Sequence, residues 1–406
     1  MEVLIKHLCW RGRKHMNSFA VHAHTFVLPG SLAGPGYLSV VDGTIGSWSP
    51  TPPQGFEIVE QLDAWVAPGY VDIHIHGFSG HDVMDCDAEG VLIAAQKLLQ
   101  AGTTSWTPTT LTQPQDEIEQ ACKCVAQAKK KQAESGYSSR IQGIFLEGPF
   151  FVADRAGAQN PRNMLDPNIA LINRWQQVSD GLITRCSLAP ERSGSETFCA
   201  QATEMGVVCS LGHSNATYEQ GLAAVAAGAR VFVHTYNAMS GLLHRSPGLV
   251  GCAMATPTTT AELICDGLHV APGAVAALVA AKGWEHVALV SDCLRCGGMP
   301  EGDYMLGDFP IRVTEGVARL IQEDGTLGNI AGSTLTLARA VQNVVAWGVA
   351  SPEQAIRMAS EVPARAAGIE KSCGSLRTGM PADFNILAPD LSVRSTYLAG
   401  RLVTEQ

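Results

Sequence analysis

The stretch "APGYVDIHIHG", residues 67–77, decides the fold class. Val71, Ile73 and Ile75 are β-branched, which favours an extended strand. Side chains alternate along a strand, so His74 and His76 are expected to lie on the same face. Two imidazoles on one face can bind a common divalent ion such as zinc.

The spacing of two histidines is not sufficient on its own. The segment "VHAHTF", residues 21–26, has the same spacing at His22 and His24. No strong apolar strand and no loop-to-helix pattern follow it, so the solvated face of a small sheet explains that pair. The surroundings of residues 74–76 must therefore decide between a metal site and two polar residues on a half-buried strand.

Composition limits the class of protein. A chain of 406 residues is long for a single core, so one large domain and a smaller one are expected. The net charge of −10 argues against nucleic acid or an anionic membrane as a partner. The N-terminal sequence lacks the apolar core of a signal peptide, and no run of about 20 apolar residues predicts a membrane span.

The cysteines predict free thiols in a reducing compartment. Twelve cysteines are scattered through the chain, many inside apolar runs, which suits buried thiols of a cytoplasmic protein better than a disulfide framework. Cys293 and Cys296 form a lone CxxC motif. A structural zinc site would need a second pair at suitable spacing, so we expect two buried thiols there.

Short apolar strands alternate with amphipathic helices. Eight strands are predicted, at residues 71–76, 103–108, 141–147, 183–189, 207–213, 230–236, 261–266 and 286–292. Helical stretches lie between them, for example at 89–102, 217–229 and 272–283. Near-continuous apolar strands alternating with helices indicate a parallel sheet covered by helices. Eight such units predict an α/β fold, a (β/α)8 barrel of the TIM type.

Both ends of the chain have a different pattern. Residues 18–62 and 374–404 contain short strands with turns, and two helices are expected around 333–348 and 352–367. We interpret the two ends as one small β-sandwich domain. The predicted division is residues 1–65 and 368–406 for the small β-domain and 66–367 for the barrel.

Metal-ligating residue types gather where the predicted strands end. They are His74, His76, Glu147, His213, His234, Asp266, His269 and Asp292. The carboxyl ends of barrel strands form the rim on which active sites are built. Histidine and carboxylate ligands with open positions indicate a hydrolytic metal site. No lysine lies between Lys131 and Lys282, so Glu147 is the available bridging carboxylate.

The chain resembles the amidohydrolase superfamily and, within it, the family of N-acetylglucosamine-6-phosphate deacetylases. The resemblance rests on "APGYVDIHIHG", "LEGPF", "GHSNATYEQG", "HTYNAMS", "HRSPGLVG", "CDGLHV", "VSDC", "AGSTLTLARAV" and "GSLRTGMPADFNIL", which together span most of residues 66–388. It implies metal-dependent hydrolysis of the N-acetyl group of N-acetylglucosamine 6-phosphate to glucosamine 6-phosphate and acetate, in cytoplasmic amino sugar metabolism.

The resemblance also implies roles for single residues. Glu147, His213 and His234 would bind the main ion, and His74 with His76 a second one, the metal being zinc or iron. Asp292 would be the general base and acid, and His269 would contact the substrate carbonyl. The resemblance further implies a homodimer, with substrate-binding residues Asn237, Ala238 and Arg245, the arginine reaching the phosphate in the partner's site.

One departure from the family pattern concerns the sugar. The segment "GAQNP", residues 157–161, places Gln159 where many members carry a histidine that touches the sugar. An N-acetylgalactosamine-6-phosphate deacetylase is therefore an alternative. Another amidohydrolase, such as a cyclic-amide hydrolase or an N-acyl-amino-acid deacylase, is a separate alternative, against which the missing lysine and the "HSNAT", "NAM" and "HR" motifs count. A non-catalytic barrel scaffold is the alternative from another class, but none of the expected ligands is missing.

Overall fold

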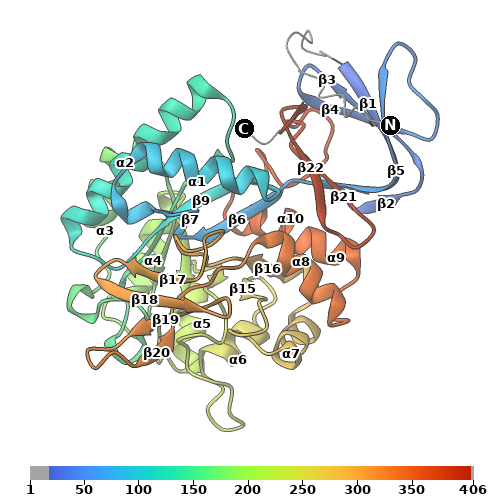
Figure 1. Cartoon of the computed structure of the whole chain (residues 1–406). Helices are drawn as coiled ribbons and strands as arrows, with labels where there is room; N and C mark the ends of the chain where they lie inside the picture. The colour runs from blue at the N-terminus through green and yellow to red at the C-terminus, as the bar shows by residue number, and fades with distance from the viewer. Residues whose placement is uncertain (1–17, 404–406) are drawn as a thin grey trace.

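The structure, a computed structural model, describes residues 18–403. Eight parallel strands form its centre, with helices on the outside (Figure 1). In chain order they are β6 (Tyr70–Ile75), β9 (Thr103–Thr110), β11 (Ile144–Phe150), β12 (Ile183–Leu188), β13 (Val208–Leu211), β14 (Val231–Phe232), β15 (Thr260–Ile264) and β16 (Val287–Val290). The predicted (β/α)8 barrel is confirmed for each of its eight strands.

The barrel closes at its carboxyl rim. Parallel pairing runs from β6 through every strand to β16. The ring is completed by a parallel bridge between Ile75 and Cys293. There the Asp292 N–H donates to the carbonyl of His74, and the His76 N–H donates to that of Cys293, both at 2.9 Å. Closure therefore sets the first strand's histidines beside Asp292.

The helices cover the outer faces of the barrel strands (Figure 1). They are α1 (Ala88–Gln100), α2 (Gln115–Ser135), α3 (Ile169–Val178), α4 (Ser195–Glu204), α5 (Tyr218–Ala226), α6 (Gly248–Ala255), α7 (Pro272–Lys282), α8 (Leu337–Ala346), α9 (Pro352–Met358) and α10 (Glu361–Ala366). The single helix predicted at 352–367 is two helices. Pro363 has no N–H, and its ring would clash with the Ala359 carbonyl in a continuous helix, so the chain breaks at 359–360.

The two ends of the chain share one mixed sheet, which confirms the predicted small β-structure. It contains β1 (Ser18–Leu28), β2 (Ser31–Ala33), β3 (Gly36–Val41), β4 (Thr44–Ser49), β5 (Glu57–Pro68), β21 (Phe384–Leu387), β22 (Val393–Leu398) and β23 (Arg401–Leu402). The ends meet where β21 pairs with β5. Only Gly69 separates β5 from β6, and the division of the chain at 65/66 and 367/368 stays a prediction.

A second small sheet was not predicted. Residues 302–330 form the antiparallel strands β17 (Gly302–Leu306), β18 (Phe309–Thr314), β19 (Val317–Ile321) and β20 (Leu327–Ile330). Glu315 and Gly316, both with positive φ, make the tight turn between β18 and β19. Such turns are a sequence signal for a hairpin. Leu306, Ile311 and Val313 of this sheet pack on Leu111 and Leu294 beside the barrel rim.

The described cysteines are free thiols, nearly all of them buried, as predicted, and Cys9 lies outside the described residues. Cys293 and Cys296 belong to neither group of side chains that could hold a metal.

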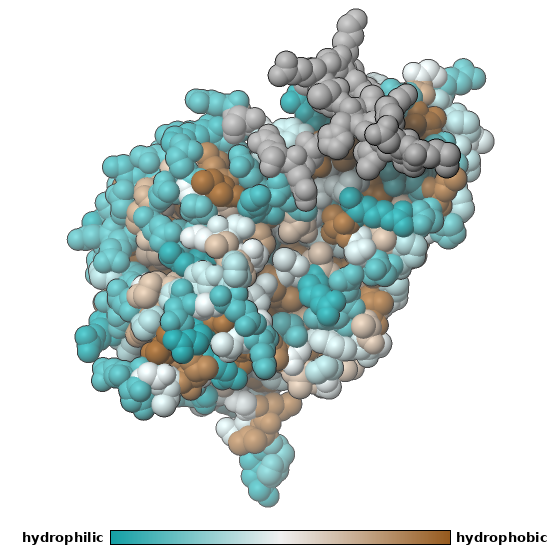
Figure 2. Space-filling view, in the orientation of Figure 1, coloured by the Kyte–Doolittle hydropathy of each residue, from teal (hydrophilic) through white to brown (hydrophobic). Residues whose placement is uncertain are grey.

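Figure 2 shows hydrophilic residues over most of the visible face. Within residues 18–403, no helix has both the length and the apolar character that a membrane crossing requires.

Candidate metal centre

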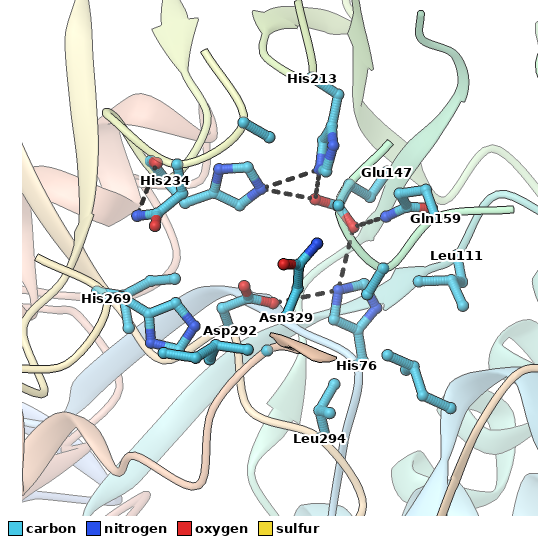
Figure 3. Close-up of a pocket in the computed structure, with 18 of the residues that line it drawn as sticks. His76, Leu111, Glu147, Gln159, His213, His234, His269, Asp292, Leu294 and Asn329 are labelled. Carbon is cyan, nitrogen blue, oxygen red and sulfur yellow. Dashed lines mark hydrogen bonds and ion pairs between the residues drawn. The ribbon is translucent and has the colours of Figure 1, made fainter. Parts of the chain in front are cut away.

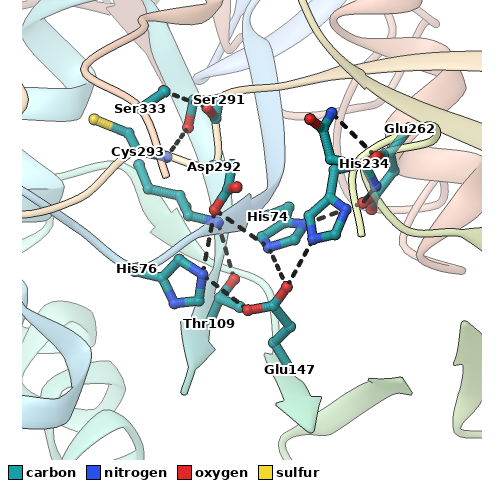
Figure 4. Close-up of polar contacts among 12 residues, drawn as sticks. His74, His76, Thr109, Glu147, His234, Glu262, Ser291, Asp292, Cys293 and Ser333 are labelled. Carbon is teal, nitrogen blue, oxygen red and sulfur yellow. Dashed lines mark hydrogen bonds and ion pairs between the residues drawn. The ribbon is translucent and has the colours of Figure 1, made fainter. Parts of the chain in front are cut away.

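Two groups of potential ligands meet at the carboxyl rim of the barrel. Their six members are all buried and lie in or just after five of the barrel strands (Figures 3 and 4). One group is Glu147, His213 and His234, and the other is His74, His76 and Asp292. Within each group the ligand atoms lie within 4.8 Å of one another. The structure thus brings together every residue for which a metal-binding role was predicted, with Asp292 beside them.

The backbone turns sharply at three of these residues. His213, His234 and Asp292 have φ values of 45°, 27° and 48°, in the left-handed region that non-glycine residues seldom adopt. Each follows the last residue of its strand within two positions. Strain of this kind concentrates at functional sites, and here it turns the side chains inward over the barrel mouth.

The carboxylate of Glu147, a residue inside β11, lies at the centre of the cluster. Its Oε1 lies 3.1 Å from Nε2 of His234, 3.3 Å from Nε2 of His213 and 3.4 Å from Nε2 of His74. Its Oε2 lies 3.2 Å from Nε2 of His76. Figure 4 draws the contacts of Glu147 with His74, His76 and His234, and Figure 3 draws the contact with His213. One carboxylate therefore faces four imidazole nitrogens and belongs to both halves of the site.

The arrangement of donors fits a cation. Nδ1 of His213 lies 2.8 Å from the carbonyl oxygen of Arg155. A carbonyl oxygen only accepts, so Nδ1 carries the proton and Nε2 is left with a lone pair. That lone pair faces Nε2 of His234 at 3.1 Å and the Glu147 carboxylate. Three atoms that can all act as acceptors require a proton or a metal ion between them.

The electrostatics of the ion-free site point the same way. Burial raises the pKa of the Glu147 carboxyl, but the surrounding imidazoles outweigh it and hold the pKa well below its usual range. Burial lowers the pKa of His76, yet hydrogen bonds and charge from Asp292 and Glu147 raise it to about 9. The pKa of His74 is also raised, against burial, by Asp292, Glu147 and Glu262. Ionised carboxylates that favour positive charge on the neighbouring imidazoles this strongly also attract divalent cations.

Two of the residues behind the cluster were not predicted. Arg185 of β12 and Glu262 of β15 form a fully buried ion pair inside the barrel. Burial raises the pKa of Glu262, but Arg185 and His74 lower it to about 2. Both residues interrupt apolar strands, and that interruption was the available sequence signal. Their pairing was not visible because the two residues are 77 positions apart.

A cavity of about 520 Å³ opens above the cluster. Its floor includes Glu147, His213, His234 and Asp292, while the unpredicted β17–β20 sheet contributes part of the wall. The wall residues from that segment are Leu306, Arg319, Gly328, Asn329 and Ile330. Asn329 lines the same cavity as Asp292 and His76 (Figure 3). The cavity is large enough for a monosaccharide derivative.

His269 lies at one side of the cavity. Its Nδ1 lies 2.6 Å from Oδ2 of Asp266, whose Oδ1 accepts the backbone N–H of His269 itself at 2.8 Å. Burial raises the pKa of Asp266, but the hydrogen bond from His269 outweighs it and lowers the pKa. Asp266 thereby fixes the orientation of the ring, and Nε2 is the nitrogen left for the cavity.

Gln159 is buried in the cavity wall. Its Oε1 accepts the N–H of Thr112 at 2.7 Å, so its amide nitrogen must be the atom that faces Oε2 of Glu147, at 2.5 Å. Both ends of the amide are therefore engaged within the protein. A contact with a sugar would use the second amide hydrogen.

The three predicted phosphate-binding residues are not all in one place. Asn237 and Ala238 line the cavity, and the backbone N–H of Asn237 already donates to the carbonyl of His234 at 3.0 Å. Arg245 is not among the cavity-lining residues. It lies in the exposed segment 241–246, which projects below α6 in Figure 1 and carries the exposed Leu242 and Leu243.

Comparison with known proteins identifies a family and similar relatives. The amidohydrolase family matches residues 65–403. The chain is 37% identical to the N-acetylglucosamine-6-phosphate deacetylase of Vibrio furnissii over 83% of its length and 82% of the relative's. It is 36% identical to the N-acetylgalactosamine-6-phosphate deacetylase of Escherichia coli O157:H7 over 90% of its length and 94% of the relative's.

A solved structure agrees with these relatives. The crystal structure of N-acetyl-D-glucosamine-6-phosphate deacetylase from Mycobacterium smegmatis superposes with a TM-score of 0.88 at 31% identity, covering 95% of this chain and 100% of that one. The family match, the barrel and the two groups of ligands at its rim agree. The chain belongs to the amidohydrolase family.

Proposed function

We propose that this protein removes the acetyl group from N-acetylglucosamine 6-phosphate, giving glucosamine 6-phosphate and acetate. The observation that carries the proposal is the pair of ligand groups around Glu147, with Asp292 at the floor of a cavity of sugar size. The similarity to deacetylases over more than four-fifths of the chain supports this substrate class.

The residues present would hold two divalent ions, zinc or iron in our proposal. Glu147, His213 and His234 would hold the first, and His74, His76 and Asp292 the second. Imidazole and carboxylate suit either metal. A bound ion of this kind lowers the pKa of water toward neutrality and polarises an amide carbonyl.

Asp292 is the group that moves the proton. Its Oδ1 lies 3.3 Å from Nε2 of His76, and burial of the carboxyl, which raises its pKa, is outweighed by the two histidines, so the pKa lies below the usual range. The carboxylate is thus ionised and accepts a proton from the attacking water. It then delivers that proton to the amine nitrogen as the carbon–nitrogen bond breaks.

His269 orients the substrate. Asp266 accepts the Nδ1 proton and holds the ring, and a second proton on Nε2 would let the ring donate to the carbonyl of the acetyl group on the side of the cavity opposite Gln159 (Figure 3). A fixed polar group that meets the carbonyl oxygen where charge develops acts without reorganisation during the reaction. His269 therefore assists the step in which water adds to the carbonyl carbon.

The phosphate needs local positive groups, because the net charge of −10 repels a dianion. We propose that the N–H of Ala238 and the side-chain amide of Asn237 contact it. Arg245, exposed on its projecting segment, would reach the phosphate in the partner of a homodimer. Arginine offers the planar fork of donors that phosphate prefers.

A second substrate deserves a direct comparison. The relative from Escherichia coli O157:H7 is named for N-acetylgalactosamine 6-phosphate and is matched over more of this chain. Gln159, at the position expected to touch the sugar, is held by Glu147 and Thr112. N-acetylgalactosamine 6-phosphate, which differs only in the configuration at the 4-hydroxyl, is therefore the alternative substrate. The kcat/KM values for the two sugars distinguish them.

The experiment is acetate release from matched sugars. The purified protein, with its metal content measured, is given N-acetylglucosamine and N-acetylgalactosamine, each with and without the 6-phosphate. We expect the highest kcat/KM with N-acetylglucosamine 6-phosphate. Preference for the galactosamine epimer would select the second candidate, and no release from any of the four would reject the deacetylase function.

The free thiols of the described cysteines support a further proposal, that the protein works in the reducing cytoplasm.

A further inference from the structure

The buried ion pair between Arg185 and Glu262 has no role in the reaction proposed above. Arg185 and Glu262 are 1% and 0% exposed. The guanidinium also donates to the carbonyl of Ile73 at 2.9 Å and stacks 3.5 Å above the Phe145 ring. A buried ion pair is often no more stabilising than apolar residues of the same volume, so stability alone does not account for it.

Glu262 touches one ligand from each metal group. Its Oε2 lies 3.0 Å from Nδ1 of His74 and accepts the backbone N–H of His234 at 3.2 Å. Figure 4 shows Glu262 beside His234 and draws its contact with His74. An ionised carboxylate only accepts, so Nδ1 of His74 must carry its proton. Nε2 is then the nitrogen that gives up its proton and binds a metal.

Nε2 of His74 points into the second group. Nε2 lies 3.4 Å from Oε1 of Glu147 and 3.5 Å from Oδ1 of Asp292, and it has no hydrogen-bond partner among the described residues. His76 differs, because its Nδ1 is buried without a hydrogen-bond partner in the same part of the chain. His74 is therefore the histidine of this group whose tautomer is fixed by the protein.

We propose that Arg185 and Glu262 are positioning residues that hold His74 in its metal-binding tautomer and thereby set the affinity of the second ion. Arg185 fixes the carboxylate, the carboxylate fixes Nδ1–H, and Nε2 is left to the ion. This inference rests on the proposed two-ion site, and it names the residues on which the second ion depends. Loss of such a partner typically weakens metal binding about 10- to 100-fold.

Three variants separate this role from simple packing. In Glu262→Gln, the amide has one oxygen for three donors, because Arg185, His74 and the His234 N–H all need an acceptor. In the double variant Arg185→Met, Glu262→Gln, the guanidinium is gone and the amide oxygen can turn to His74. In Arg185→Met, Glu262→Leu, no acceptor remains. In both double variants the side chains at positions 185 and 262 are uncharged, and glutamine and leucine at position 262 have similar volumes.

The readouts are the metal bound per subunit, from elemental analysis, and the affinity of the second ion, from competition with a chelator. Selective ¹⁵N-histidine NMR of the zinc-loaded protein reports the tautomer of His74. We expect Arg185→Met, Glu262→Gln to keep the second ion and the Nδ1–H tautomer. Glu262→Gln and Arg185→Met, Glu262→Leu should bind that ion about 10- to 100-fold more weakly while keeping the first.

A matched control removes another ion pair. Arg140 and Asp383 join β10 (Arg140–Ile141) to the terminal sheet, with Nε to Oδ2 at 2.7 Å. Arg140→Met, Asp383→Leu should leave both ions in place. If the apolar variant Arg185→Met, Glu262→Leu does not fold, the comparison of Glu262→Gln with Arg185→Met, Glu262→Gln decides.

Equal affinity for the second ion in wild type, in Glu262→Gln and in Arg185→Met, Glu262→Leu would overturn the inference. So would a second ion that is weakened equally in the two double variants, because only one of them retains an acceptor. Either result leaves acetate release by the wild-type protein untouched, so the proposed function is tested separately. Conversely, an inactive wild-type protein that still shows these metal affinities would reject the function alone.

Discussion

The two ligand groups at the barrel rim are built differently. His213 and His234 lie at strand ends with left-handed backbone and border the cavity. His74 lies inside β6, is fully buried and is backed by the Arg185–Glu262 pair. Burial opposes protonation of His74 and His76, yet nearby carboxylates raise both pKa values. An ion in the second group must therefore displace protons, and we expect the first group to bind more firmly.

The largest effect should follow from breaking the first group. His213→Ala removes one of only two imidazoles there and should abolish tight binding of the main ion together with acetate release. Elemental analysis and the acetate assay on the same preparation measure both. Full metal content in this variant would mean that His213 is not a ligand of the main ion.

Breaking the carboxylate of the second group should cost less. Asp292→Asn keeps the shape but cannot accept a proton, so kcat should fall about 10²- to 10⁴-fold, as for other general acid–base groups, while KM changes little. Steady-state kinetics with the phosphorylated sugar measure this. Turnover close to wild type would remove Asp292 from the mechanism.

A change outside both groups should affect only substrates with a phosphate. A hydrogen bond to a charged group contributes roughly 1.5–3 kcal/mol, so Arg245→Ala should lower kcat/KM by about 10- to 150-fold for the 6-phosphate and hardly for the plain sugar. Equal losses for both sugars would reject the phosphate role.

The same variant tests the proposed dimer. If Arg245 serves the partner's site, mixing Arg245→Ala with Asp292→Asn chains should restore part of the activity, because one site of each hybrid has both native residues. A fully active monomer by light scattering would reject the shared site.

A change of pH, with no substitution, sharpens the contrast between the groups. Burial lowers the pKa of His76, but hydrogen bonds to Asp292 and Glu147 raise it to about 9, against 6.5 for an unperturbed histidine. Stabilisation by its protonated ring is thus full below about pH 6.5 and is lost as the pH rises through about 9. The second ion's affinity should rise about tenfold per pH unit for each proton displaced in that window. Calorimetric titrations at several pH values, with proton release measured in two buffers, check this, and a flat profile would contradict it.

The fold and the candidate metal ligands could be predicted because they depend on short sequence patterns. Most barrel strands are short apolar runs, and His213, His234 and Asp292 follow such runs within two positions. Since parallel strands share one rim, residues far apart in sequence could be placed together. Glu147 was expected at a strand end but lies inside β11, which continues to Phe150.

The remaining features depend on pairings between distant residues. Glu262 lies 188 positions from His74, and a charged residue in an apolar strand does not reveal its partner. The orientation of Gln159 follows from a contact with Thr112, 47 positions away. The β17–β20 sheet was missed although its tight turns were visible, because short antiparallel strands differ little from loops until their pairing is known.

The most direct test of the account is acetate release from N-acetylglucosamine 6-phosphate before chelation, after complete removal of metal and after zinc or iron is returned. Wild-type protein should lose activity with the metal and regain it on reloading, whereas His213→Ala should stay inactive throughout. Undiminished acetate release by metal-free wild-type protein, or none after reloading, would contradict the assignment of this cluster as the centre of a metal-dependent deacetylase.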